Sequence, residues 1–335
     1  MSVSARSAAL VIAGLLLTAC GGDDGSEGSD DSGGSAGQVT EDAGPTAVAE
    51  PTTVWVGSSE ASALLKVDPA TRAVEKIPVD EGPWKVAFAE SSLWVQTPEV
   101  QRRDPTTGQP SDILFEEVYV HDFLVDGDGI WMSLRDEPKL VRYDLASGQP
   151  EDEVQLPSAD FNLEYLALQG DSMLAANSYD GTAVRIDLTT GEVVGRYNPD
   201  EVIWDVQLID DSLWVAHYGG LVELDAATLA PRRTIQGVEA AYALSADETG
   251  QLWVGLDDMV GTIDDSGQFQ PVAASVSDGT GAGNVDDIEV SEQSVWITHE
   301  DVGLVRLDRA TGQLDEPVAL PGVGAFAPTF DIALQ

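Results

Sequence analysis

An apolar-Trp-apolar triplet recurs along this chain of 335 residues and constrains its fold more than any other feature. Leu174 holds the equivalent place between the third and the fourth triplet, and successive centres lie 39, 37, 43, 40, 39 and 43 residues apart. A fixed period of this size indicates seven copies of one structural unit, each too small to bury its apolar face alone. The triplets are centred on Trp55, Trp94, Trp131, Trp214, Trp253 and Trp296.

An aspartate follows each centre after 10 to 13 residues. Five of these aspartates lead into a turn that ends in glycine, as in Asp104–Gly108, whereas two turns end in Arg72 and Leu229. An aspartate side chain bonds backbone N–H groups ahead of it, and glycine accepts a positive φ. We therefore predict hairpin turns with structural aspartates, not paired catalytic carboxylates. The aspartates are Asp68, Asp104, Asp144, Asp187, Asp225, Asp264 and Asp308.

Apolar residues between these marks alternate with period two, which is typical of strands. Each unit is predicted to hold four strands: A before the Trp, B with the Trp, C ending at the Asp, and D after the turn. The first unit lacks strand A, but Phe330–Leu334 matches the strand A sequences His121–Val125 and Trp204–Leu208. The sequence thus predicts an all-β, seven-bladed β-propeller of four-stranded blades, in which the C-terminal strand closes the first blade and removes an exposed edge.

Units of the form Leu-Trp-Val followed by Asp-Pro-x-Thr-Gly resemble those of seven-bladed propellers of the YVTN/quinoprotein-like and streptogramin-lyase-like group. The resemblance covers Pro51–Gln335 and implies the same fold. It implies no single function, because propellers host binding, scaffolding and catalysis alike. The Gly-His and Trp-Asp marks of WD40 repeats are absent.

The first 20 residues are predicted to be an export signal. A short segment with Arg6 precedes the apolar run Ala8–Leu17, which is too short to span a bilayer. Leu17-Thr18-Ala19-Cys20 resembles a bacterial lipobox, which implies that the Cys20 thiol receives diacylglycerol and becomes the mature N-terminus; the alternative is a plain signal peptide. Residues 21–51 are rich in Gly, Ser and Asp and are predicted to be a disordered tether, and residues 52–335 form the propeller.

Charge limits the partners. The formal net charge is −43, and residues 51–335 alone hold 51 acidic and 15 basic residues. Nucleic acid is an unsuitable partner because phosphate binding needs Lys and Arg patches. The predicted contact with the membrane is through the Cys20 lipid only. The single cysteine allows neither an internal disulfide nor a cysteine-based zinc cluster.

Candidate functional residues gather where strand A begins and strand B ends, which is one face of a propeller, here called the mouth. All three histidines fall there, as do the two tryptophans outside the repeat marks. The Gly-rich segment Ser275–Gly283 also enters this face and is predicted to be mobile. The predicted ligand-binding residues are Trp84, Lys85, His121, Asp122, Glu164, Trp204, Asp205, His217, Asp287 and Asp331.

Two interpretations of these residues stay open. In the structural one, strand A aspartates tie neighbouring blades together through backbone hydrogen bonds, Trp84 and Trp204 fill wedges between blades, and His217 and His299 are ordinary rim residues. In the functional one, carboxylates that face one cavity take up protons, pair with cations such as Lys85, or bind a metal.

The functional interpretation predicts two kinds of chemistry at the mouth. Asp205, Asp287 and His299 are candidate ligands for Mg²⁺ or Ca²⁺, which prefer oxygen donors. His299 and Glu300 are candidates for acid/base work. Strand alternation, however, places those two side chains on opposite faces of their strand.

The sequence favours a lipid-anchored, extracytoplasmic propeller of the bacterial cell envelope that binds a small ligand, glycan or protein at its mouth. The alternative is a metal-assisted lyase resembling the streptogramin lyases, and a quinone-cofactor dehydrogenase is a third hypothesis. The sequence leaves open whether the protein is an enzyme.

Overall fold

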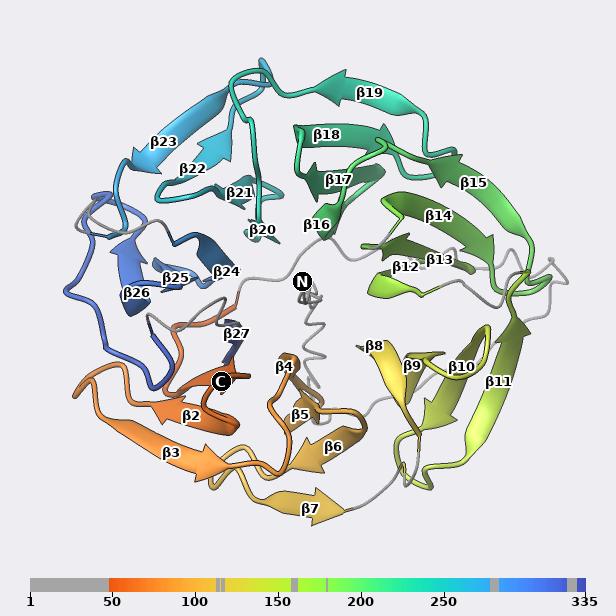
Figure 1. Cartoon of the computed structure of the whole chain (residues 1–335), viewed down its shortest axis with the longest axis horizontal. Coiled ribbons are helices and arrows are strands. Elements are labelled where there is room, and N and C mark those ends of the chain that lie inside the picture. The colour runs from red at the N-terminus through yellow and green to blue at the C-terminus, as the bar shows by residue number, and fades with distance from the viewer. Residues whose placement is uncertain are drawn as a thin grey trace, which may run out of the picture.

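The computed structural model describes residues 48–112, 115, 118–157, 162–178, 180–277, 283–323 and 330–335. Seven small antiparallel sheets stand in a ring around a central axis, as Figure 1 shows. The predicted export signal and most of the predicted tether lie outside the described residues. No helix in the described part is long and apolar enough to cross a membrane.

Each sheet is one blade, with its first strand nearest the axis. Blade one orders its strands β27 (Phe330–Leu334), β1 (Val54–Ser58), β2 (Ala63–Val67) and β3 (Val74–Pro78). Blade two holds β4 (Lys85–Ala89), β5 (Ser92–Gln96), β6 (Val100–Arg103) and β7 (Pro110–Asp112). Blade three holds β8 (Val120–Asp126), β9 (Gly129–Leu134), β10 (Lys139–Asp144) and β11 (Pro150–Gln155). Blade four holds β12 (Glu164–Gln169), β13 (Ser172–Asn177), β14 (Thr182–Asp187) and β15 (Val193–Tyr197).

The remaining three blades continue the ring. Blade five holds β16 (Ile203–Ile209), β17 (Ser212–His217), β18 (Gly220–Asp225) and β19 (Pro231–Thr234). Blade six holds β20 (Ala243–Ala246), β21 (Leu252–Gly255), β22 (Val260–Ile263) and β23 (Phe269–Ala273). Blade seven holds β24 (Val285–Val290), β25 (Ser294–His299) and β26 (Gly303–Asp308), and isolated pairings of Leu304 with Val318 and of Leu307 with Leu314 stand in for its fourth strand.

The C-terminal strand closes the ring as predicted. β27 pairs antiparallel with β1, from Val54 opposite Leu334 to Ser58 opposite Phe330. Two further backbone bonds extend the pairing, from Thr52 N to Gln335 O at 2.7 Å and from Gln335 N to Thr53 O at 3.0 Å. Blade one therefore exists only when both ends of the chain are in place.

The core consists of seven wedges between neighbouring blades. The marker residue of each blade packs toward the blade that follows, so that Trp55 lies in the wedge of blades one and two and Trp296 in that of blades seven and one. Leu174 fills the wedge between blades four and five, which confirms that it replaces a Trp. Burying a Trp removes roughly 150–250 Å² from water, so these side chains account for much of the adhesion between blades.

The aspartate turns have the predicted structure. The Asp104 Oδ1 atom accepts backbone N–H groups of Thr106 and Thr107 at 3.0 and 2.7 Å, and the other six turns repeat this bonding in part or in full. The last turn residue has a positive φ in every unit. Arg72 and Leu229 adopt it at 61° and 57° without being glycine. The network of hydrogen bonds therefore imposes the left-handed backbone that glycine only makes easier.

Consecutive strands alternate in direction, so the ring has two distinct faces. The mouth carries the turns that follow the second strand of each blade and the connections between blades. The opposite face, here called the base, carries the aspartate turns and the turns that follow the first strands.

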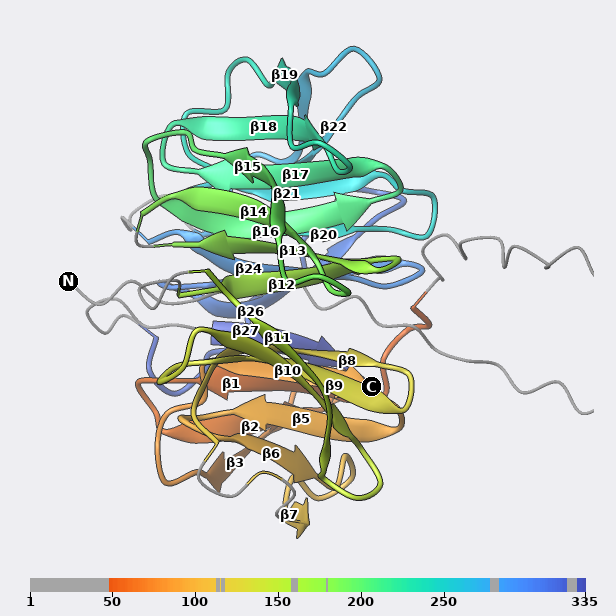
Figure 2. The ribbon, with the colours of Figure 1, turned by 90° about the vertical axis from the view of Figure 1, so that its right-hand side faces the viewer.

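The beginning of the described chain is bound at the base. The Glu50 carboxylate accepts hydrogen bonds from Ser291 Oγ at 2.6 Å, Gln293 N at 2.8 Å and Ser294 Oγ at 3.0 Å. The Val48 carbonyl accepts the Glu292 N–H at 2.7 Å. Ordered contacts thus begin before residue 52, where the sequence placed the start of the propeller. These first residues and the C-terminus lie at the same end of the ring axis (Figure 2).

Removal of Phe330–Gln335 is expected to abolish cooperative unfolding, because it takes away the inner strand of blade one and exposes the edges of β1 and of two wedges. Circular dichroism during urea titration measures this. Deleting six residues of the predicted tether, 22–27, is the matched control and should leave the transition unchanged. A truncated protein that unfolds like its parent would show that closure is dispensable.

Candidate functional site

Four aspartates of the inner strands each connect their own blade to the next, at four of the seven junctions. Each carboxylate accepts a backbone N–H from the inner strand of the next blade. The donor is the residue directly after the one that aligns with the aspartate. All four aspartates are buried. The bonds join Leu166 N to Asp122 Oδ2 at 2.8 Å, Leu244 N to Asp205 Oδ2 at 2.7 Å, Ile332 N to Asp287 Oδ2 at 2.8 Å, and Val86 N to Asp331 Oδ2. These bonds are those of the structural interpretation of the sequence.

Lys85 occupies the equivalent position in blade two, and its side chain connects this blade to blade three. Its ammonium donates to Asp122 Oδ1 at 2.8 Å and to the Phe123 carbonyl at 2.7 Å, and it lies 4.8 Å from the centroid of the Phe123 ring. Its side chain is only 3% exposed. A buried ammonium needs such partners, because an unpaired one costs several kcal/mol, of order 3–5. Lys85 is therefore part of the ring that joins the blades.

The axis carries more carboxyl groups than its one lysine can balance. Glu289 lies two residues after Asp287 on β24, on the same side of the strand. Burial raises the pKa of Glu289 well above its usual range, and the nearby charges of Asp287 and Asp205 raise it further, while Lys85 partly offsets them. Burial and Asp287 likewise raise the pKa of Asp331. The raised pKa values of Glu289 and Asp331 favour the protonated form of these two carboxyls, and Lys85 pairs with a third, Asp122.

His217 and His299 end β17 and β25 and have the same local role. In each ring the Nδ1 atom accepts a backbone N–H two residues ahead, from Gly219 and from Asp301, both at 3.1 Å. A neutral ring with an accepting Nδ1 carries its proton on Nε2. The Nε2 atom of His299 lies 3.6 Å from Asp258 Oδ1, beyond hydrogen-bond distance, and the side chain is 1% exposed.

Glu300 faces backbone N–H groups instead of the His299 ring. Its carboxylate accepts Asn284 N at 3.1 Å, and Asp301 accepts Gly283 N at 2.8 Å. At the other end of the Gly-rich segment, Asp258 accepts Ser275 Oγ and Ser277 N, both at 2.6 Å. These carboxylates fix the two ends of this segment, of which residues 278–282 lie outside the described residues. The described contacts of the predicted acid/base pair, His299 and Glu300, therefore help to hold the Gly-rich segment in place.

Trp84, His121 and Glu164 come together with Arg135, which the sequence analysis missed. The Arg135 guanidinium lies 4.7 Å from the centroid of the Trp84 ring. Burial raises the pKa of Glu164 to about 7; a hydrogen bond from Ser178 lowers it, the Asp122 charge raises it and Arg135 lowers it. Burial and the Arg135 charge lower the pKa of His121. This section of the mouth, across blades two to four, therefore holds one carboxyl, that of Glu164, which changes protonation near neutral pH.

Trp204 belongs to a different section. Its ring lies 5.7 Å from that of Tyr242, at an interplanar angle of 45°, in the junction of blades five and six. Its indole N–H is buried without a hydrogen-bond partner. Trp84 directly precedes β4 and Trp204 lies in β16, and these two strands are on opposite sides of the ring in Figure 1. The sequence put these residues on one face, but the structure does not bring them into one pocket.

Three-ligand metal geometry is missing from the described residues. No group of three or more His, Cys, Asp or Glu side chains there is placed to hold a metal ion, and this includes Asp205, Asp287 and His299. Both oxygens of Asp205 and of Asp287 accept backbone N–H groups. Binding of Mg²⁺ or Ca²⁺ stays a prediction that these contacts do not support.

Comparison with known proteins supports the fold alone. No protein-family model matches the sequence, and no curated protein matches it. The chain is similar to the WD40 β-propeller domain of Doa1, with a TM-score of 0.61 and 12% identity over 77% of this chain and 89% of that one. It is also similar to the computationally designed protein Ika8, with a TM-score of 0.57 and 14% identity over 80% of this chain and 85% of that one.

Replacement of Glu289 by Gln is expected to flatten the dependence of stability on pH. The pKa of this carboxyl is raised in the folded protein, so its contribution to stability is complete below the ordinary value of 4.5 and is lost as the pH rises through the raised value. Thermal unfolding should show a smaller loss of Tm between about pH 5 and about pH 9 than in the parent. Glu292→Gln, exposed in the same blade, is the control, and equal slopes for Glu289→Gln and parent would contradict the assignment.

Proposed function

We propose that this protein is a lipid-anchored binding module of the bacterial cell envelope that engages its partner through the mouth. The observation that carries this proposal is the position of the exposed aromatic residues. Among the described residues, three large hydrophobic side chains are exposed, and two of them, Tyr119 at 42% and Tyr218 at 61%, lie at the mouth. Tyrosine is enriched in protein interfaces because it offers a large, rigid contact area and a polar end.

The base is less suited to binding because its groups are already used. Side chains close its aspartate turns, and the segment that contains Val48 and Glu50 covers part of blade seven. The first described residues thus lie on the face opposite to the mouth. The lipobox residues Leu17–Cys20 support anchoring through the predicted tether.

The lyase hypothesis has no specific support in the described residues. His299 is buried, and the Glu300 carboxylate accepts the backbone N–H of Asn284, so both side chains are engaged within the protein. The pKa of Glu164 is raised to about 7 and that of His121 is lowered, but perturbed pKa values also arise in structural networks. We therefore propose binding as the function and no reaction.

A photo-crosslinking amino acid at position 218 or 119 is expected to capture discrete partners when the protein is expressed in a bacterial envelope. Position 194 is the matched control, since Val194 is 53% exposed on the outer strand β15 and away from the mouth. Mass spectrometry should identify a partner that both mouth positions share and position 194 lacks. Identical products from all three positions would refute a mouth-specific function.

Replacement of Cys20 by Ser is expected to release the protein from the membrane fraction. A thiol-linked diacylglycerol supplies the anchor in the proposal, and serine offers no thiol for that linkage. The measurement is metabolic labelling with an alkyne fatty acid, followed by fractionation. The parent should be labelled and sediment with membranes, and Thr18→Ser, which keeps the lipobox pattern, should behave like it; an unlabelled parent would contradict the anchor.

A further inference from the structure

The basic residues of the propeller are unevenly distributed between its two faces. Most of them lie at the wedges and the base. A cation stands directly across from the marker Trp in four blades, in the pairs Trp55 with Lys66, Trp94 with Arg102, Trp131 with Arg142 and Trp296 with Arg306. In blades five and six the cation comes from elsewhere: Arg233 lies 5.2 Å from the Trp214 ring centroid and Arg309 lies 6.0 Å from that of Trp253. Each of these cations thus lies close to a marker Trp or directly across from one.

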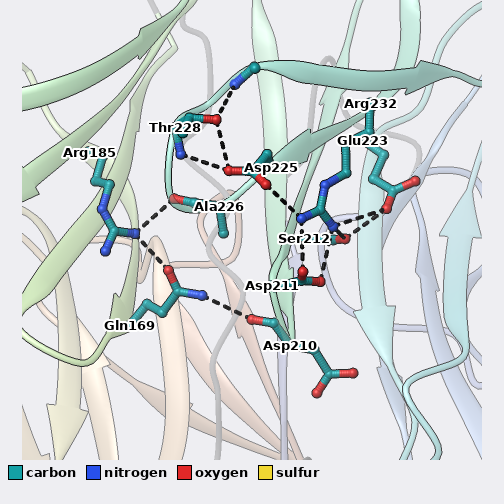
Figure 3. A network of polar contacts seen from close by, with 11 residues as sticks. Gln169, Arg185, Asp210, Asp211, Ser212, Glu223, Asp225, Ala226, Thr228 and Arg232 are labelled. Carbon is teal, nitrogen blue, oxygen red and sulfur yellow. Dashed lines mark hydrogen bonds and ion pairs between the residues drawn. The ribbon is translucent and has the colours of Figure 1, made fainter.

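Further arginines are bound within the base, as Figure 3 shows for blades four and five. Arg232 contacts Asp211 at 2.8 Å and Asp225 at 2.7 Å. Arg185 donates to Gln169 Oε1 at 2.6 Å and, across the blade boundary, to the Ala226 carbonyl at 2.8 Å. The negative charge of the base is thus partly neutralised by groups of the protein itself.

At the mouth, few cations are available to neutralise the carboxylates. Lys139 is held between Glu137 and Glu153 at 2.8 and 2.9 Å, Lys85 is buried in the axis, and Arg135 stacks on Trp84. The exposed carboxylates Asp136, Asp180 and Glu201 form no ion pair with another described residue. The negative charge of these three carboxylates at the mouth is therefore not offset by an ion pair within the described residues.

Each exposed tyrosine is joined by a backbone hydrogen bond to the chain neighbour of one of these carboxylates. The Tyr218 N–H donates to the Val202 carbonyl at 3.0 Å, which brings Glu201 next to it. The Tyr119 carbonyl accepts the Arg135 N–H at 2.9 Å, which brings Asp136 next to it. An aromatic face attracts a Lys or Arg side chain through its quadrupole, and an adjacent carboxylate binds the same cation. Two such pairs on one face match a segment with several basic residues.

Other occupants of this face are disfavoured by charge. The predicted tether of this chain has eight acidic and no basic residues, so its own mouth repels it. A second copy brings another excess of acidic groups, and nucleic acid or an anionic membrane brings phosphates. A cationic protein segment is the occupant that the charges and the aromatic faces both suit.

We propose that the mouth docks a Lys- and Arg-rich protein segment, with Tyr119 and Tyr218 stacking on its cations and Asp136 and Glu201 pairing with them. This rests on the proposed binding function and specifies the chemistry of the partner.

Calorimetric titration of the purified protein with a synthetic peptide of six Lys-Gly units tests this proposal. Binding is expected, and the affinity should fall at least about tenfold between about 50 and about 300 mM salt because screening weakens exposed charge pairs. A peptide of six Glu-Gly units should give no heat. The variant Asp136→Lys/Glu201→Lys should bind the Lys-Gly peptide at least about tenfold more weakly, and Tyr119→Ser/Tyr218→Ser should also weaken it.

The matched control is Asp171→Lys/Glu292→Lys, which changes the net charge equally with exposed residues of the base. It should change the affinity by less than about twofold. Equal losses for mouth and base variants would show unspecific attraction to an acidic protein and overturn the proposal, as would no binding of the Lys-Gly peptide. If crosslinking still captured one partner at positions 119 and 218, the binding function would stand and only the cationic partner would be wrong.

Discussion

The pairing of β27 with β1 is the contact on which the rest of the ring depends. It joins residues from the two ends of the chain into one blade and thereby completes the wedges on both sides of it. The aspartates of the inner strands then continue the connection around the axis, since Asp287 bonds to β27 and Asp331 on β27 bonds to Val86. The β27–β1 pairing and the carboxylate bonds thus act together at blade one, so a break there affects both neighbouring blades.

Most of the fold could be predicted from the sequence because the same local chemistry is repeated seven times. One Trp or one Asp turn would be a weak signal, but the period made even Leu174, Arg72 and Leu229 recognisable as members of the pattern. The structure differs where the repeat is weakest. The outer edge of blade seven is reduced to isolated pairings, and the ordered body begins before residue 52 because Glu50 finds hydrogen-bond donors at the base.

The candidate site was harder to predict, because register places a residue on a face without giving the partner of its side chain. The three histidines do lie at the mouth, yet two of them bond to the backbone of their own turns. Glu289 escaped notice, although it follows Asp287 by two residues and so shares its side of the strand. Arg135 escaped because its role depends on Trp84 in another blade, a contact that no spacing in the sequence encodes.

β27 belongs to blade one but follows the strands of all the other blades in the sequence. It is therefore synthesised after them, whereas its partner β1 is synthesised before them. Closing a loop of this length carries a large entropic cost, so the long-range pairing forms late. A prematurely terminated chain lacks this strand altogether, and it leaves unpaired edges and open wedges that proteases and chaperones recognise. The ring therefore closes only after the strands of all seven blades have been made.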